Sequence, residues 1–260
     1  MGLLGWIIIF SLLGGVLSVL AASLFLLVPE RHRLHLIPHF ISFAIGALLG
    51  AAFLALLPHA VASPVRVDVH QIGLTVLLGM LGFFLLEKMV LWRHCHHDHC
   101  EVHDPSVGHS NYSAAGTLVL IGDAIHNLVD GVLIAAAFLT DIHLGIVTSL
   151  AVAAHEIPQE VGDFAVLLHS GYSRGRAFFF NVLVSLTTLV GAILAYYSLS
   201  GMNQYLPYIL AITAASFIYI AVADLIPDLH KRTRFRETVQ QIALIMAGII
   251  FIYFAHATLH

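Results

Sequence analysis

The chain has 260 residues, of which 59% are hydrophobic and only 10% are charged, and its formal net charge is −4. Soluble globular domains are about one-quarter charged, so this composition excludes an ordinary soluble domain and indicates an integral membrane protein. The slight acidity also argues against nucleic-acid binding, which needs a basic surface.

Apolar runs of about 20 residues, the length that crosses a bilayer as a helix, recur along the whole chain. They predict an all-α membrane protein with a single transmembrane domain over residues 1–260. The first run lacks the basic start of a signal peptide and exceeds the length of its apolar core, so we expect a membrane helix there. The eight predicted spans are Leu3 to Val28, Phe40 to Ala62, Ile72 to Trp92, Ser113 to Thr140, Leu144 to His169, Ala177 to Ser200, Leu206 to Leu229 and Val239 to Leu259.

Basic residues orient the predicted bundle. Of the 11 Lys and Arg residues, all but Arg66 follow or close spans one, three, five and seven. By the positive-inside rule those four loops lie in the cytoplasm and both termini lie outside. The short loops favour a cell membrane, most simply a prokaryotic inner membrane, with an intracellular eukaryotic membrane as the alternative.

The loop between spans three and four, at about residues 94–112, is rich in metal-binding side chains. A disulfide is not expected in the reducing cytoplasm, so weak, fluxional zinc binding is the favoured interpretation. The alternative is a solvated tether without a fixed site. The candidate ligands are His94, Cys95, His96, His97, His99 and Cys100.

A faint internal symmetry relates spans two and seven. Span two ends in LLPH at 56–59 and span seven in LIPD at 225–228, each after a run of small residues. Because the two spans run in opposite directions, the pattern fits an inverted repeat of spans one to three and six to eight around a central pair, spans four and five.

Two polar motifs interrupt that central pair: HNLVDG at 126–131 and HEIPQE at 155–160. A charged residue near the middle of a bilayer costs about 3 kcal/mol, so the carboxylates here must meet one another, water or a cation. The neighbouring histidines favour a transition-metal cation. The five carboxylates of these two spans are Asp123, Asp130, Glu156, Glu160 and Asp163.

The spacing of the motifs places their side chains on common helix faces. Residues four apart lie above one another, which pairs His126 with Asp130 and His155 with Gln159. Two such pairs on facing helices offer four ligands for a tetrahedral Zn²⁺ site, and the nitrogen ligands argue against Mg²⁺ or Ca²⁺. A second stripe lies about 100° around each helix and is richer in oxygen. It holds Asp123, Asn127, Glu156, Glu160 and Asp163.

Several of these residues also have simpler interpretations. Asp123 and Asp163 could line the mouths of a pathway or hold helices together through hydrogen bonds. His59 and Asp224, like Asp228, lie towards span ends, where solvent can satisfy them, and we expect them to be pathway residues at most.

In these two motifs the chain resembles the ZIP metal-ion transporters. The HNxxDG and HExPxE patterns match residue by residue, and the histidine-rich loop and the eight spans with outside termini agree. The resemblance implies a homodimer, a 3+2+3 helix arrangement and a binuclear centre between the fourth and fifth helices. By that resemblance, one site comprises His126, Asp130, His155 and Gln159, with Asn127 and Glu156 contributing to its neighbour.

Two departures bear on selectivity. Many relatives have histidine at the position of Gln159, and an amide is a weaker ligand, so Fe²⁺, Mn²⁺ or Cd²⁺ are alternative substrates to Zn²⁺. Some relatives carry a further carboxylate in the sixth helix, where this chain offers only Thr187 and Thr188.

The leading hypothesis is a zinc-preferring importer rather than an enzyme. No GxxxxGK[ST] loop exists in the sequence, which excludes ATP hydrolysis of that type. A divalent cation gains about 4.6 kcal/mol on entering a cell at about 100 mV, inside negative. An intramembrane metalloprotease is disfavoured because Gln159 replaces the second histidine of HExxH and Pro158 precedes it. A proton-conducting or metal-sensing protein would share the carboxylates but would carry no metal flux.

Overall fold

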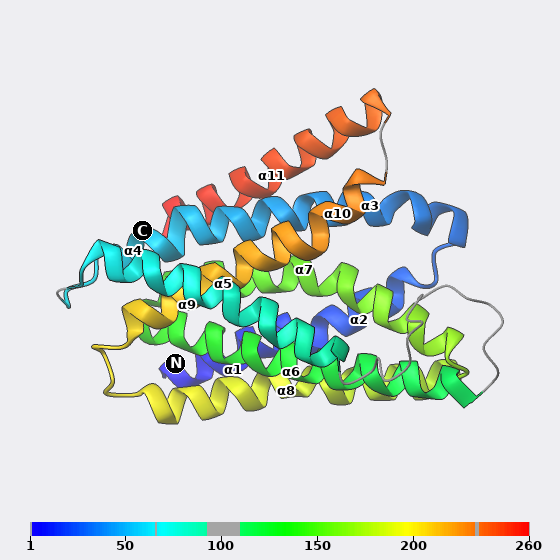
Figure 1. Cartoon of the computed structure of the whole chain (residues 1–260), viewed down its shortest axis with the longest axis horizontal. Helices are drawn as coiled ribbons and strands as arrows, with labels where there is room; N and C mark the ends of the chain where they lie inside the picture. Colours follow the sequence, from blue (N-terminus) through cyan, green and yellow to red (C-terminus); the bar gives the residue numbers. More distant parts are fainter. Residues whose placement is uncertain (1, 66, 93–109, 232–233, 260) are drawn as a thin grey trace.

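The computed structural model describes residues 2–65, 67–92, 110–231 and 234–259, and within these ranges the chain is a bundle of helices without strands (Figure 1). The elements are α1 (Leu3–Gly14), α2 (Val16–Phe25), α3 (Glu30–Gly50), the π-helix η1 (Ala51–Leu56), α4 (Leu57–Val61), α5 (Val69–Trp92), α6 (Ser110–Thr140), α7 (Ile142–His169), α8 (Arg174–Leu199), α9 (Leu206–Tyr219), the π-helix η2 (Ile220–Leu225), α10 (Ile226–His230) and α11 (Phe235–Leu259). The all-α membrane architecture predicted from composition is confirmed.

Seven helical stretches in the described part of the chain are long and apolar enough to cross a membrane. They correspond to predicted spans one to four and six to eight. The remaining long helix, α7, has 28 residues but is not among the seven. Its composition explains this, because Glu156, Glu160 and Asp163 lie on it. The helix with most of the candidate ligands is therefore too polar to be counted among the candidate membrane spans.

The first span is broken at Gly15, where α1 ends and α2 begins. Its backbone angles, φ −88° and ψ −89°, are not helical. A β-carbon at this position would lie 2.6 Å from the backbone oxygen of Ser185 on α8. The break therefore coincides with a contact against α8 that only glycine allows.

Spans two and seven share a local distortion that the tetrapeptides LLPH and LIPD had hinted at. Each has one turn of π-helix, η1 or η2, followed directly by a short α-helix whose second residue is proline, Pro58 or Pro227. A proline has no N–H to donate, so the turn before it must change its hydrogen bonding. The two segments therefore correspond in structure as well as in sequence.

Helices α6 and α8 approach each other at backbone contact beside the polar motifs. A β-carbon on Gly131 would lie 1.9 Å from the backbone oxygen of Thr188, and one on Gly191 would lie 2.1 Å from that of Leu128. Larger residues would force the helices apart. The final glycine of the HNLVDG motif thus brings α8 next to the candidate ligands.

The histidine-rich segment at 94–109 lies outside the described residues, as does Arg66. The predicted weak zinc site formed by His94, Cys95, His96, His97, His99 and Cys100 therefore stays a prediction. The described basic residues Arg33, Arg174 and Lys231 lie near helix ends that share one end of the bundle, as the predicted topology requires.

Candidate metal centre

A one-residue reversal sets α6 and α7 side by side. Asp141 is the only residue between them, and its Oδ1 caps α7 by accepting hydrogen bonds from the backbone N–H groups of His143 (2.8 Å) and Leu144 (3.0 Å). His126 lies 15 residues before Asp141 and His155 lies 14 residues after it. Because both helices rise by about 1.5 Å per residue, the two motifs meet at the same depth.

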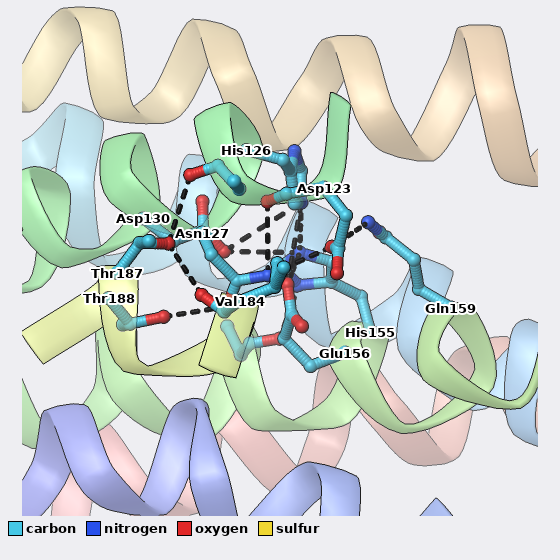
Figure 2. A network of polar contacts seen from close by, with 12 residues as sticks. Asp123, His126, Asn127, Asp130, His155, Glu156, Gln159, Val184, Thr187 and Thr188 are labelled. Carbon is cyan, nitrogen blue, oxygen red and sulfur yellow. Dashed lines mark hydrogen bonds and ion pairs between the residues drawn. The ribbon is translucent and has the colours of Figure 1, made fainter. Parts of the chain in front are cut away.

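Four side chains converge there, and we call them the histidine cluster: His126, Asp130, His155 and Glu156 (Figure 2). The two imidazole Nε2 atoms are 3.2 Å apart. Asp130 Oδ2 lies 3.3 Å from Nε2 of His155 and 3.9 Å from Nε2 of His126. Glu156 Oε1 lies 3.6 and 3.5 Å from the same two nitrogens. One atom from each residue therefore surrounds a common point.

These separations are close to those of tetrahedral zinc coordination, and the longer ones need only small side-chain shifts to reach them. Zinc binds nitrogen and oxygen at about 2.0–2.1 Å, which puts neighbouring ligand atoms about 3.3 Å apart in a tetrahedron. The five distances between the imidazole nitrogens and their neighbours in the histidine cluster run from 3.2 to 3.9 Å. The side chains could hold a small dication without rearranging the backbone.

Hydrogen bonding and burial also favour a cation at the histidine cluster. The Nδ1 of His155 contacts the Ala151 carbonyl at 3.2 Å, which directs Nε2 inward, a common arrangement of metal-binding histidines. Asp130 and Glu156 are each 1% exposed, and none of their carboxylate oxygens has a hydrogen bond within the described chain. Buried carboxylates without hydrogen-bond donors are rare unless a cation balances them.

A second group, the carboxylate cluster, adjoins the first and shares one of its members. Asp123, Glu156 and Glu160 place one oxygen each within 4.8 Å of one another, and they are 5%, 1% and 0% exposed. Three carboxylates this close repel one another unless a cation or protons intervene. Sequence spacing put Glu156 in the second stripe alone, whereas in the structure it serves both clusters.

Two predicted ligands face Asp123 with their amide nitrogens. Asn127 Nδ2 donates to Asp123 Oδ1 at 2.8 Å, and Gln159 Nε2 lies 3.4 Å from the same oxygen. The carbonyl oxygen of Asn127 accepts a 2.6 Å hydrogen bond from the Thr188 hydroxyl on α8. We call Thr188, Asn127 and Asp123 the amide relay (Figure 2). The sequence marked Thr188 only as a position near which some relatives have a carboxylate. Its contact with Asn127 could have been predicted from Gly131, because a glycine there lets α8 come close to α6.

The remaining predicted residues lie around the clusters rather than in them. Asp163 is one helical turn beyond Glu160, and its Oδ2 is buried without a hydrogen bond in the described chain. Asp224 lies in η2, and His59 lies in α4 near the other end of the bundle. Metal ligation by each member of the predicted set stays a prediction: His126, Asn127, Asp130, His155, Glu156, Gln159 and Glu160.

Two cavities approach from opposite ends of the bundle. One of about 540 Å³ reaches Asp123, His126 and Asp163 and extends to Asp228, near the basic end. The other, of about 480 Å³, is lined by residues such as His59 and includes no member of either cluster. The centre is thus reached by the first cavity and not by the second.

Comparison with known proteins identifies the family of the chain. A family model described as ZIP zinc transporter matches residues 2–256. The chain belongs to this family. Zinc transporter ZIP13 of Pongo abelii is 35% identical over 222 residues, which are 81% of this chain and 64% of that protein. The mouse protein of the same name is 33% identical over 242 residues, 81% of this chain and 67% of the relative.

A more distant relative covers more of the chain. The Zinc transporter ZIP13 homolog of Drosophila melanogaster is 29% identical over 310 aligned positions, 93% of this chain and 86% of that protein. The chain spans about two thirds of the length of the first two relatives. The predicted membership of the ZIP family is confirmed.

Proposed function

We propose that this ZIP family member is a zinc-preferring transporter that carries divalent metal ions into the cytosol without ATP hydrolysis. The observation that supports this proposal most is the close spacing of the histidine cluster. Nε2 of His155 lies 3.2 Å from Nε2 of His126 and 3.3 Å from Oδ2 of Asp130. The metal is the transported substrate, and the chain makes and breaks no covalent bond. Fe²⁺, Mn²⁺ and Cd²⁺ are the competing substrates to test, because Gln159 stands where many relatives have histidine.

The proposed centre lies between α6 and α7 and holds two neighbouring sites. The metal ligands are the predicted set His126, Asn127, Asp130, His155, Glu156, Gln159 and Glu160. In the geometry described above, Asn127 and Gln159 serve Asp123 through their amide N–H groups, and ligation through their oxygens requires each amide to rotate. Asp163, Asp224 and His59 are proposed pathway residues.

The direction of transport is proposed from the inside-negative membrane potential, which favours entry of a dication, and the two cavities indicate which state of the transport cycle the structure has. The cavity at the basic end contacts His126, and the basic end is the cytoplasmic one by the positive-inside rule. On the other side, Phe217 is fully buried and its ring lies 6.3 Å from that of His155. We propose that this arrangement is an inward-facing state, with Phe217 in the barrier that must open to admit metal from outside.

The proposed architecture has eight membrane helices. The eighth is α7, whose polar side chains are proposed to bind the substrate metal. The matching π-helical turns η1 and η2 support the inverted repeat of a 3+2+3 arrangement around α6 and α7. We further propose a homodimer in a cell membrane, most simply a prokaryotic inner membrane, with both termini outside and the histidine-rich loop in the cytoplasm.

Zinc uptake into proteoliposomes tests the proposed function. His155→Ala should abolish uptake, because His155 is 1% exposed and contacts every other member of the histidine cluster. His169→Ala is the matched control, since it removes an exposed imidazole from the same helix. Unchanged uptake by His155→Ala would refute the proposed centre, and absence of metal flux in the wild type would refute the function.

A further inference from the structure

A cavity of about 280 Å³ lies away from the metal centre, between α2, α3, α7 and α8. Its polar side is formed by Arg33 on α3 and Arg174 at the start of α8. Its apolar side is formed by residues that include Leu27, Phe164 and Phe178. The cavity opens at the basic end of the bundle, where a cytoplasmic leaflet would meet the protein.

The two arginines of this cavity have no partner within the described chain. No described acidic side chain forms an ion pair with either guanidinium. The Nε of Arg33 is buried and has no hydrogen-bond acceptor. A buried guanidinium N–H without an acceptor is unfavourable, and a planar guanidinium fits the oxygens of a phosphate particularly well. An anion such as phosphate would supply an acceptor to both guanidinium groups.

The apolar side of the cavity changes from buried to exposed along its length. Phe164 is 4% exposed and belongs to a small apolar cluster with Leu167 and Ala177. Phe178 is 36% exposed and Leu27 is 79% exposed. A free phosphate ion would leave this apolar rim uncovered, whereas the acyl chain of a lipid would cover it.

We propose that this cavity binds the headgroup of an anionic phospholipid, with Arg33 and Arg174 on the phosphate and an acyl chain along Phe178 and Leu27. Basic cavities between membrane helices on the cytoplasmic side are suited to such headgroups. A bound lipid would join four helices, α2, α3, α7 and α8, at the end of the bundle that the larger cavity enters. This inference does not rest on the proposed transport activity.

Native mass spectrometry of the full chain, with phosphatidylglycerol or phosphatidylcholine added to the detergent, tests the proposal. We expect the wild type to retain phosphatidylglycerol in preference to phosphatidylcholine. Arg33→Gln with Arg174→Gln should weaken phosphatidylglycerol retention by about 100-fold, because each of the two lost charge-assisted hydrogen bonds is worth about tenfold. Arg234→Gln with Arg236→Gln is the matched control, since it removes two exposed cations from the same end.

Three results would overturn the proposal. One is equal retention of the two lipids by the wild type, and another is an equal loss in the two double variants. The third is full displacement of phosphatidylglycerol by millimolar inorganic phosphate, which would show a site for the free ion. If the Arg33 variant does not fold, Arg174→Gln alone carries the test, because Arg174 is exposed and the loss of its hydrogen bond should still weaken retention by about tenfold.

Discussion

The histidine cluster and the carboxylate cluster share Glu156 and lie on the same two helices, but their surroundings differ. In the histidine cluster, imidazole nitrogens lie within 3.2 to 3.9 Å of every partner, and no amide group intervenes. In the carboxylate cluster, Asp123 already accepts from the amides of Asn127 and Gln159. The first therefore has the geometry of a metal site, whereas the second has a hydrogen-bond network that a metal would have to compete with.

The largest expected effect comes from the residue common to both clusters. Glu156→Gln removes a charged carboxylate from each cluster. If Glu156 is a ligand of both sites, as proposed, zinc uptake in proteoliposomes should fall by at least about 100-fold, more than the loss of a residue that only supports a ligand. Glu237→Gln on α11 is the control, since Glu237 belongs to neither cluster.

A substitution at Glu160 distinguishes the two clusters, because Glu160 belongs only to the carboxylate cluster. Glu160→Gln changes the carboxylate cluster alone and should lower the number of zinc ions bound in equilibrium dialysis while keeping the tighter site. If Glu160→Gln and Glu156→Gln have the same effect on binding and uptake, the two clusters do not act as separate sites.

The dependence of uptake on external pH distinguishes imidazole from carboxylate ligands. A metal ion must displace the proton from each imidazole, and imidazole in water titrates near pH 6.5 whereas carboxylates titrate near pH 4. Uptake through the histidine cluster should therefore be full at neutral pH and fall by roughly tenfold per pH unit below about 6, for one limiting imidazole. A profile that stays flat down to pH 5 would show that the histidines do not bind the transported ion.

The course of the helices and the position of the motifs could be predicted because both depend on local sequence. Apolar length predicted the seven spans that are also long and apolar enough to cross a membrane in the structure, and the motifs themselves placed His126 and His155 on two consecutive helices. The break at Gly15 could not be predicted, because it coincides with a close approach to Ser185, which lies far away in the sequence. The π-helical turns were indicated only indirectly, by the prolines that follow them.

Within the site, residue types were easier to predict than pairings. Helical spacing grouped His155 with Gln159, but a side chain as long as glutamine can turn its amide to either neighbour. In the structure it faces Asp123, because a carboxylate is the stronger hydrogen-bond acceptor. The same freedom lets Glu156 reach both imidazoles, which a projection along the helix axis does not show.

A substitution at Gln159 tests whether this residue affects zinc binding as a metal ligand beside His155 or only through its hydrogen bond to Asp123. Gln159→His should tighten zinc binding by about tenfold, because it supplies a nitrogen ligand in place of an amide, and it should slow release. The measurement is zinc affinity in competition with Mn²⁺, where the preference for zinc should also rise. An unchanged zinc affinity would mean that residue 159 acts only through its hydrogen bond to Asp123.

The smallest effect is expected at the amide relay, and it needs a matched pair. Thr188→Val removes the hydroxyl that holds Asn127 while keeping the shape of the side chain. Zinc affinity should weaken by about two- to tenfold, the value of one neutral hydrogen bond, and Thr188→Ser should restore it. Thr187→Val is the control, because the Thr187 hydroxyl donates to the backbone carbonyl of Ala124 and not to the relay.

A double-mutant cycle with Asn127→Ala then separates positioning from general stability. If Thr188 acts only through Asn127, Thr188→Val should have no further effect on zinc affinity once Asn127 is alanine, because the group it positions is gone. Additive losses would show that Thr188 acts elsewhere, for example in packing against Gly15. A β-carbon added at Gly15 would lie 3.2 Å from the Thr188 hydroxyl. Thermal stability measured on the same variants identifies that case, because a packing defect lowers it in both backgrounds.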